Sequence, residues 1–376
     1  MRRHSPEREE LMETLRLVAP GTGLYEGLEN ILRARTGALI LVGDSEEVMR
    51  IVNGGFRIDV ELDPACLYEL AKMDGALIIS SDAKRILVAN AHLTPDPLIP
   101  TTETGTRHRT AERAAVQTGE LVIAISQRRN VITLYKGEHR YVLREIGTIL
   151  AKANQALQTL ERYKDVLQKA LLKLTALEFE DQASLADVSA VIQRAELIAR
   201  IAAEIELNIC ELGTEGRLVS MQLEEVLADI EDEDELVLRD YIEPLAEERV
   251  EEAQAALAKA ATEDLLDPGF IIRVLGYGIG TNPETIVPTR GLRILLKIPR
   301  LPAPVIENLV KKFQRDGLSI AIEAGNQTAW VYDELVKLGA QVTVVNPTKV
   351  KLIAESRRKT DQIDAKIFLN LITTTS

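Results

Sequence analysis

The first third of the chain alternates between short apolar runs and segments whose apolar residues recur every three or four positions. The runs TGALILVG, DGALIISSD, RILVANAH, ELVIAISQ and NVITLYKG have strand length and are bounded by Gly, Asp or Asn. The intervening segments LYEGLENILRA, DPACLYELAKM and RTAERAAVQTG have a helical period, with a start signal at Asp63-Pro64 and a stop signal at Gly119. Residues 1–143 are therefore predicted to form an α/β domain with a mixed sheet.

From about residue 144 the helical period continues without strand-like runs. Apolar residues spaced by three and four, from Ile146 to Leu174, predict one long amphipathic helix. The segment LADVSAVIQRAELIARIAAEIELNICELG predicts a second, and further helix extends to about Lys259. The acidic stretch IEDEDELVLRDY within it is typical of a solvated face. Residues 144–265 are predicted to form an all-α helical spine.

Glycine and proline become frequent after residue 265. The segment LDPGFIIRVLGYGIGTNPETIVPTRG predicts a linker, and its GYGIG is interpreted as a turn because it does not open a helix after a clear strand. LKIPRLPAPVIENLVKKF predicts helix, tight turn, helix, so residues 266–315 combine a linker with a partial helix-hairpin-helix. In residues 316–376, LSIAIEAGNQTAWVYDELVKLGAQVTVVNP predicts strand, helix, strand.

Composition limits the function classes. The chain has 376 residues, 46% of them hydrophobic, but no apolar run of the roughly 18 residues that a membrane span needs. The charged start MRRHSPEREELMETL does not resemble a signal peptide. Two distant cysteines, Cys66 and Cys210, favour a reducing cytoplasm over a disulfide framework or a cysteine-rich zinc site. A net charge of −13 disfavours non-specific adhesion to nucleic acid or membranes, although it leaves room for a local basic face.

Against this acidic background, GTRHRTAERA concentrates positive charge next to a glycine. The chain has no Walker loop of the Gly-x-x-x-x-Gly-Lys-Ser/Thr type, so a nucleotide would need another phosphate cradle. Gly105 would let the backbone approach an anion, and a helix opening near Thr110 would aim free N–H groups at it. Arg107 and Arg109 offer planar forks for phosphate oxygens. The alternative is a solvated helix start.

A carboxylate precedes one of the predicted strands. The segment MDGALIIS places Asp74 just before the strand, followed by the small residues Gly75 and Ala76. Such a carboxylate can hold a divalent metal or orient a hydroxyl, and Mg²⁺ commonly binds one or two carboxylates together with substrate phosphates. The alternative for this pair alone is a plain turn.

Taken together, Asp74-Gly75-Ala76 and Arg107-His108-Arg109 resemble the diadenylate cyclase domain. The segments GTRHRTAERAAVQT, ELGTEGRLVSMQLEEVL, LRDYI and RGLRILLKIPRLPAPVIENLV extend the likeness to the DNA integrity scanning protein (DisA) family over about residues 3–313. The resemblance implies an enzyme that condenses two ATP molecules into cyclic di-AMP and releases two pyrophosphates. The 3′-hydroxyl of one ATP attacks the α-phosphorus of the other, where two cyclase domains face each other. It also implies an octamer with central helical spines and DNA-binding hairpin domains at its ends.

The resemblance assigns roles to individual residues. Asp74 would serve the metal, Mg²⁺ or Mn²⁺, and the 3′-hydroxyl, and it forms the catalytic set with Arg107, His108 and Arg109. The residues expected to bind ATP are Gly75, Ala76, Leu93, Thr106, Arg107, His108, Arg109, Thr110 and Ser126. Within this set, His108 needs no base role, because donating to a phosphate suffices.

After Phe313 the second hairpin turn of the DisA family is missing, and the segment from about Ser319 resembles DEDD insertion-sequence transposases related to the Piv invertase. That family has an RNase H-like core, and its pattern falls here on Glu323 and on KTDQIDA, which contains Asp361 and Asp364. Two aspartates three apart share a helix face and can converge on a metal. The strand that carries the family's first aspartate and its later serine-bearing region are absent, so the sequence predicts a fusion with a truncated RNase H-like α/β tail and an incomplete two-metal site.

Three functions are compatible with these features. The leading one is the diadenylate cyclase, with DNA binding weakened by the missing hairpin. The second is a DNA-binding scaffold whose cyclase is idle. The third is a transposase or recombinase, which the missing aspartate disfavours. The basic run KVKLIAESRRK is interpreted as a solvated helix face, with phosphate contact as the alternative.

Overall fold

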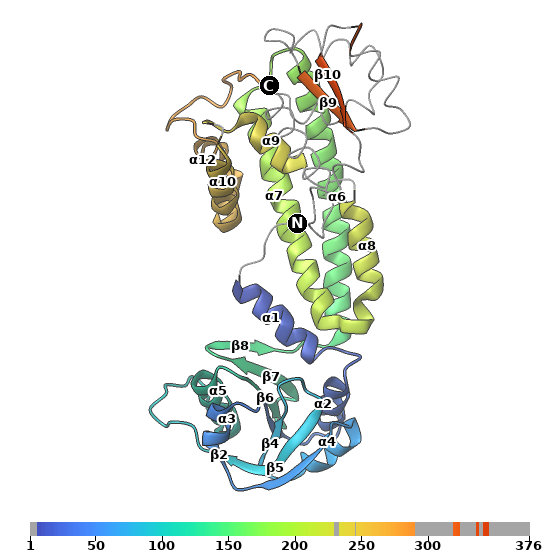
Figure 1. Cartoon of the computed structure of the whole chain (residues 1–376), viewed down its shortest axis with the longest axis vertical. Helices are drawn as coiled ribbons and strands as arrows, with labels where there is room; N and C mark the ends of the chain where they lie inside the picture. The colour runs from blue at the N-terminus through green and yellow to red at the C-terminus, as the bar shows by residue number, and fades with distance from the viewer. Residues whose placement is uncertain are drawn as a thin grey trace. The chain divides into compact units, whose positions relative to one another are not determined.

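The computed structural model in Figure 1 describes residues 6–228, 233–244, 246–289, 319–323, 336–337 and 341–345. The chain divides into two compact units. The first comprises Met1–Thr159 and Ile201–Glu225, and the second comprises Leu160–Arg200 and Val226–Ser376. The long helices α6 (Ile146–Phe179) and α7 (Leu185–Leu212) contribute to both units, and they match the two long helices predicted from the apolar period.

A mixed eight-stranded sheet forms the centre of the first unit, as predicted. Its strands follow the order β2-β5-β4-β1-β6-β7-β8, with β3 paired to β5. The pair β1–β4 is parallel and the other pairs are antiparallel. The strands are β1 (Ala38–Val42), β2 (Val52–Asn53), β3 (Phe56–Glu61), β4 (Ala76–Ile79), β5 (Arg85–Leu93), β6 (Leu121–Ser126), β7 (Val131–Lys136) and β8 (His139–Val142).

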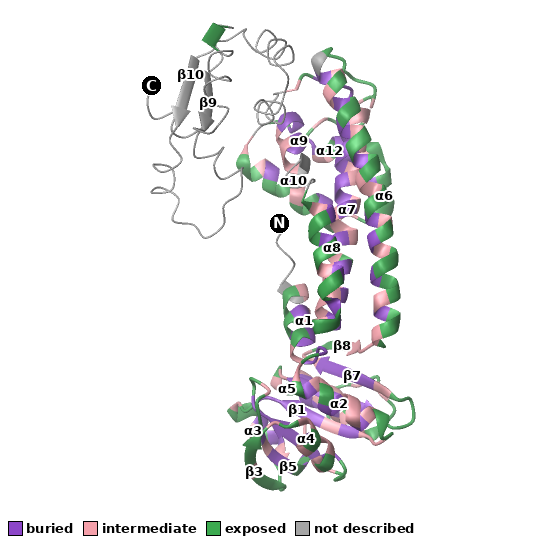
Figure 2. Ribbon diagram, turned by 90° about the vertical axis from the view of Figure 1, so that its right-hand side faces the viewer, coloured by how far each residue is buried: buried purple, intermediate pink, exposed green. Residues whose placement is uncertain are grey.

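Both faces of this sheet are covered, because the central strands are apolar at successive positions. Ile40 and Val42 pack in a core with α1 (Pro6–Leu17), α2 (Gly23–Arg33) and α4 (Pro64–Leu70). Leu41 packs in a second core, with α3 (Glu46–Ile51) and α5 (Thr106–Thr118). The central strands of the sheet are largely buried in Figure 2, whereas β3 is exposed and α6 carries exposed residues along its length.

The helix signals read from the sequence have a structural counterpart in this unit. Asp63 caps α4 by accepting from the backbone N–H groups of Ala65 and Cys66 at 3.0 and 3.1 Å, and Pro64 occupies the first helical position. Gly119 ends α5 in the left-handed conformation, with φ of 70°. The predicted start of α4 and end of α5 are both confirmed.

The end of the sheet is tied to α7 by a buried carboxylate. Glu211 accepts from the Tyr141 hydroxyl at 2.8 Å and from the backbone N–H of Arg144 at 2.9 Å. The Arg144 guanidinium also donates to Asn208 on the same helix at 2.9 Å. Burial, followed by the charge of Glu211, raises the pKa of Tyr141 to about 12. The cluster therefore joins β8, the entry to α6 and the last turns of α7 within the first unit.

Shorter helices follow α7: η1 (Gly213–Gly216), α8 (Arg217–Leu227), α9 (Glu233–Tyr241), α10 (Glu247–Lys259), α11 (Thr262–Leu266) and α12 (Pro268–Val274). The last of them lies inside the segment whose glycine and proline content predicts a linker from residue 266. Asp267 caps α12 by accepting from the Gly269 N–H at 2.9 Å, and Ile271 and Ile272 are buried. No helix in the described part of the chain is long and apolar enough to cross a membrane.

Two short strands are described in the last sixty residues. Strand β9 (Ser319–Glu323) pairs in parallel with β10 (Gln341–Val345), so that Glu323 lies opposite Val345. Both strands of the predicted strand–helix–strand unit are therefore present. The IPRLP hairpin, the run KVKLIAESRRK, Asp361 and Asp364 lie outside the described residues.

Candidate functional site

The sheet brings the separate sequence motifs to one edge. Strands β1 and β4 are parallel, with Ile40 opposite Leu77, so both begin at this edge. Strands β5 and β6 are antiparallel to their neighbours and end at the same edge, as the pairs Ala76–Ala91 and Ala38–Ile125 show. The edge therefore collects the ends of four strands, with Asp74, Gly75 and Ala76 at the start of β4, Leu93 at the end of β5 and Ser126 at the end of β6.

The basic motif lies in the first turn of α5. This helix begins four residues before Thr110, the start that the sequence suggests. The helix begins at Thr106, because Gly105 is extended (φ −86°, ψ 139°) and its carbonyl accepts from the Arg109 N–H at 2.9 Å. No side chain caps this start. The N–H groups of Thr106, Arg107 and His108 precede this first helical hydrogen bond and can donate to an anion, and the helix dipole favours negative charge at the same place.

Arg107 connects this helix start to the sheet edge. Its guanidinium lies against Gly37, just before β1, so closely that any side chain at that position would overlap it. Its Nη1 lies 3.5 Å from the carbonyl oxygen of Ile125, one residue before Ser126. Arg109, in contrast, is exposed and donates to the Thr104 carbonyl at 3.3 Å. One guanidinium is thus fixed at the edge, and the other extends into solvent beside it.

Gly75 is required by a close backbone approach. Its N–H donates to Asn90 Oδ1 at 3.1 Å, and Asn90 lies in β5 with φ of +54°. The β4–β5 register shifts between Ala76 and Ile78, which marks a β-bulge at this point. A Cβ atom on Gly75 would lie 2.6 Å from Asn90 Cα and overlap the Asn90 carbonyl carbon. The bulge and the glycine together fix the backbone that carries Asp74.

Asp74 is exposed, and within the described part of the chain no hydrogen bond or ion pair engages its carboxylate. The described residues contain no cluster of three or more His, Cys, Asp or Glu side chains that could hold a metal. A single free carboxylate fits a divalent ion whose remaining ligands come from substrate phosphates and water, which is the usual arrangement for Mg²⁺. The donor set is thus compatible with a metal bound together with a phosphate ligand.

His108 is buried, unlike its neighbour Arg109, and is the first member of a chain of hydrogen bonds. Only 5% of it is exposed, and its Nδ1 lies 2.9 Å from the hydroxyl of Tyr135 on β7. That hydroxyl donates to Glu103 Oε1 at 2.8 Å, and Arg140 Nε donates to the same oxygen at 2.8 Å. His108 Nε2 is buried without a partner among the described residues.

Burial and hydrogen bonding determine the charges of Glu103, Tyr135 and His108. Burial alone would raise the pKa of Glu103, but the hydrogen bonds from Tyr135 and Arg140 outweigh it and hold that pKa below its usual value. Burial lowers the pKa of His108, the Glu103 charge partly opposes this, and nearby arginines lower it further. Burial and the bond to Glu103 raise the pKa of Tyr135. At neutral pH this hydrogen-bonded series therefore consists of an ionised Glu103 carboxylate, a neutral Tyr135 hydroxyl and a neutral His108 imidazole.

Several residues of this site could not be identified from the sequence. Tyr135 sits in an apolar strand run and looks like ordinary core, and Glu103 is an isolated acid in a loop. Arg129, 3.8 Å from Glu103, is an exposed residue of the turn between β6 and β7, and Arg140 is an exposed residue of β8. Asn90 gives a weak signal, since Asn in the middle of a strand favours a bulge or turn.

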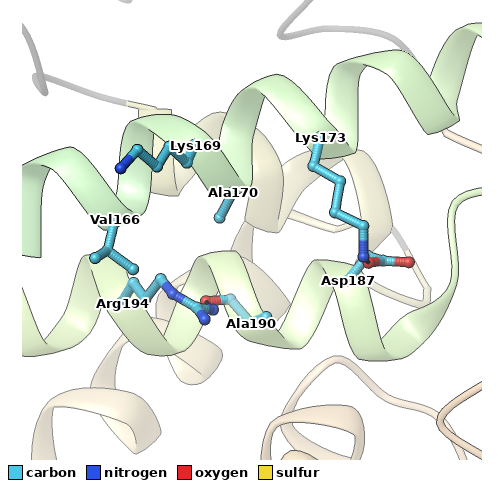
Figure 3. A pocket seen from close by; sticks show the side chains of 7 residues that line it. All are labelled: Val166, Lys169, Ala170, Lys173, Asp187, Ala190 and Arg194. Atoms are coloured by element: carbon cyan, nitrogen blue, oxygen red, sulfur yellow. Dashed lines mark hydrogen bonds and ion pairs between the residues drawn. The ribbon is translucent and has the colours of Figure 1, made fainter.

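A separate groove lies in the second unit, between α6 and α7 (Figure 3). Its volume is about 270 Å³, and it is lined by Val166, Lys169, Ala170, Lys173, Asp187, Ala190 and Arg194. Lys173 Nζ is paired with Asp187 Oδ1 at 2.7 Å. The groove contains none of the residues that the sequence singled out.

Two family models match the chain in consecutive segments. Residues 25–140 match the model described as DisA bacterial checkpoint controller nucleotide-binding. Residues 143–283 match the DisA bacterial checkpoint controller linker region. The first match contains all the motifs at the sheet edge, and the second contains α6, α7 and the shorter helices up to α12.

Several similar proteins are called DNA integrity scanning protein DisA. The one from Symbiobacterium thermophilum is 56% identical over 309 residues, which are 82% of this chain and 87% of the relative. The one from Carboxydothermus hydrogenoformans is 56% identical over 307 residues, 81% of this chain and 87% of the relative. The one from Clostridium tetani is 48% identical over 364 residues, 97% of each chain.

Proposed function

The chain belongs to the DNA integrity scanning protein (DisA) family and is a diadenylate cyclase, and we propose that Asp74, Arg107, His108 and Arg109 at the sheet edge carry out its reaction. Two ATP molecules are condensed into cyclic di-AMP with release of two pyrophosphates. The observation that carries the assignment is the uncapped start of α5, held by Arg107 at the edge where Asp74 precedes β4. Nucleotidyl transfer depends mainly on positioning and charge neutralisation, and this edge offers groups for both.

The triphosphate is bound at the start of α5 in this proposal. Free N–H groups of the first helical turn point at the phosphates, beginning with Thr106. Arg107 and Arg109 contribute guanidinium groups, one fixed against Gly37 and one exposed. The residues expected to line the rest of the nucleotide pocket are Gly75 and Ala76 at the start of β4, Leu93 and Ser126 at the ends of β5 and β6, and Thr110 in the second turn of α5.

Asp74 holds a divalent ion, Mg²⁺ or Mn²⁺, in this proposal. Its carboxylate is exposed and free among the described residues, and the Gly75–Asn90 contact fixes its backbone. When bound, the ion neutralises charge on the reacting phosphate and lowers the pKa of an attacking hydroxyl. The carboxylate itself can orient the 3′-hydroxyl of the nucleotide by accepting its proton in a hydrogen bond.

The reaction joins two nucleotides, so two copies of the site must face each other. Each cyclase domain presents one ATP, and the 3′-hydroxyl of one attacks the α-phosphorus of the other. We propose that the chain assembles for this purpose, as an octamer with the α6–α7 region at its centre. Residues 1–143 would form the cyclase domain, residues 144–265 the spine and residues 266–315 the linker with a partial helix-hairpin-helix.

Activity is expected only in assembled protein, because a lone cyclase domain holds one ATP and has no second nucleotide to attack. Size-exclusion chromatography with light scattering should show a species well above the monomer mass of 41.6 kDa. Cyclic di-AMP formation, measured fraction by fraction, should follow that species. Full activity in a strictly monomeric fraction would contradict the face-to-face mechanism.

We propose that residues 316–376 are a fragment of a DEDD transposase with an RNase H-like fold. A strand–helix–strand unit of an RNase H-like fold needs two parallel strands, as β9 and β10 are, and Glu323 is the last residue of β9. Together with Asp361 and Asp364 it would be a remnant of the metal site. The relatives from Symbiobacterium and Carboxydothermus align over 82% and 81% of the chain, which fits a likeness that stops near residue 313. The Clostridium tetani relative aligns over 97%, so the tail needs a direct test.

Branched DNA is expected to bind this chain more weakly than it binds a DisA relative with a complete hairpin domain. Tandem hairpins contact phosphates through backbone amides, and losing two or three phosphate contacts costs on the order of tenfold in affinity at moderate salt. Five cations in the run KVKLIAESRRK could compensate, but Glu355, Asp361 and Asp364 lie among or just after them.

The measurement is DNA affinity against salt for this chain, for the chain cut after Phe313, and for the complete relative. A flatter salt slope for both forms of this chain supports the proposal. If the full chain matches the relative in affinity and slope while the cut chain does not, then the tail is a working DNA-binding element and the fragment proposal is wrong.

A further inference from the structure

We propose that Glu103 and Tyr135 are positioning residues that fix His108 in the tautomer with its proton on Nδ1. His108 Nε2 then binds the triphosphate only when a second proton converts the ring to imidazolium, so nucleotide binding takes up one proton. The inference rests on the proposed function, because the anion that meets Nε2 is the ATP held at the start of α5. It changes the expected role of His108 from a constitutive phosphate donor to one that is switched on by protonation.

The direction of the hydrogen bonds follows from Glu103. Its side chain is 8% exposed, it lies 2.8 Å from Arg140 and 3.8 Å from Arg129, and its lowered pKa keeps it ionised. An ionised carboxylate only accepts hydrogen bonds, so the Tyr135 hydroxyl must donate its single proton to Glu103. The tyrosine oxygen is then free only to accept. His108 Nδ1, 2.9 Å away, must therefore carry the proton between them.

This arrangement determines what the other ring nitrogen can do. A neutral imidazole has one N–H, so Nε2 holds a bare lone pair when Nδ1 is protonated. Nε2 is buried without a partner among the described residues, and the ring edge that carries it faces the helix start, with Cδ2 3.9 Å from the Cβ position of Gly105. A bare lone pair cannot donate to a phosphate oxygen. A second proton turns the same atom into a charged donor.

Charges around the ring keep His108 neutral until an anion arrives. Burial lowers its pKa from the usual 6.5, and the charges of Arg129, Arg140 and Arg107 lower it further, while Glu103 raises it. A bound triphosphate adds several negative charges and must raise this pKa. At pH values between the pKa of His108 in the free protein and its higher pKa in the complex, binding of the triphosphate therefore takes up a proton. Affinity is greatest below this window and falls by up to about tenfold per pH unit as pH rises through it.

The test is calorimetry of α,β-methylene ATP binding to the full assembled chain with Mg²⁺ at pH 7 to 8.5, in buffers of different ionisation enthalpy. The dependence of the observed heat on the buffer gives the number of protons taken up. We expect uptake approaching one proton in the lower part of this range and a dissociation constant that rises with pH. Failure of the wild-type chain to bind the analogue at all would instead count against the proposed nucleotide site.

Tyr135→Phe is the informative variant, because it removes the hydroxyl that accepts from Nδ1, together with its hydrogen bond to Glu103. Neutral His108 can then place its proton on Nε2, so uptake should fall toward zero and the pH dependence should flatten. His108→Gln, which presents a neutral donor near the Nε2 position, should likewise bind without uptake. Glu103→Gln should lower the affinity at neutral pH, since the imidazolium loses its nearest negative charge.

Tyr141→Phe is the matched control. It likewise removes one hydroxyl that donates to a glutamate at 2.8 Å, but that glutamate is Glu211, away from His108. Proton uptake should match the wild type even if the melting temperature falls. Binding without proton uptake by the wild-type chain would overturn the proposal. Equal uptake in the Tyr135→Phe and Tyr141→Phe variants would do the same.

Discussion

Replacing Asp74 with Asn is expected to abolish cyclic di-AMP formation while leaving the fold intact. The side chain is exposed and has no partner among the described residues, so the amide costs no buried contact. The change removes the negative charge that would hold the metal while keeping the shape. Loss of charge stabilisation by about 4 kcal/mol corresponds to a decrease in turnover of about 1,000-fold.

Asp44→Asn is the matched control for this variant. Asp44 follows the end of β1, at the opposite edge of the same sheet, and accepts from the Ser81 hydroxyl at 2.6 Å. Asparagine retains an acceptor oxygen for that bond, so turnover should stay at the wild-type level. Circular dichroism and the melting temperature verify the fold of both variants. Unchanged turnover in Asp74→Asn would remove Asp74 from the mechanism.

Replacing Gly75 with Ala is expected to lower both stability and activity. The new Cβ would lie 2.6 Å from Asn90 Cα and overlap the Asn90 carbonyl carbon, so the β4–β5 pair must separate at the bulge. Overpacking of this kind costs about 1–3 kcal/mol. Because the displaced backbone carries Asp74, turnover should fall by at least about tenfold, in line with the sensitivity of catalysis to displacements of about 1 Å.

Thermal unfolding and ATP turnover check this variant against Gly147→Ala. Gly147 lies in the first turn of α6 with open space around its Cβ position, so alanine there should be tolerated. Adding Asn90→Gly to Gly75→Ala should not restore activity, because it relieves the overlap with Asn90 Oδ1 but leaves the two closer overlaps, which are with backbone atoms. Recovery in that double variant would show that the Asn90 side chain, and not the bulge, sets the constraint.

The elements that could be predicted from sequence are those with a single dominant signal. The buried strands are continuous apolar runs, and α6 and α7 repeat their apolar residues over many turns. Strand β3, FRIDVE, contains no continuous apolar run, and nearly all its residues are exposed, so its sequence gives no comparable signal. Helix α12 is hidden because Pro268 and Gly269 favour a linker, although Asp267 and Pro268 are also a helix start signal.

The candidate site was predictable only in part for a similar reason. Asp74 and the Arg107-His108-Arg109 motif stand out because charged residues flank apolar segments with small residues beside them. The start of α5 at Thr106 depends on the backbone of Gly105, which carries no side-chain capping signal. Tyr135 is indistinguishable from core in the sequence, and only the folded sheet places its hydroxyl between His108 and Glu103.

The most direct test of the account is product analysis of the full chain incubated with ATP and Mg²⁺ or Mn²⁺. The account predicts cyclic di-AMP, identified by chromatography and mass, with two pyrophosphates released for each ring. Product formation should stop when EDTA removes the metal, and 3′-deoxy-ATP should give no ring because it lacks the attacking hydroxyl. Intact ATP after incubation of the assembled chain with either metal, or hydrolysis to AMP without ring formation, would contradict the account.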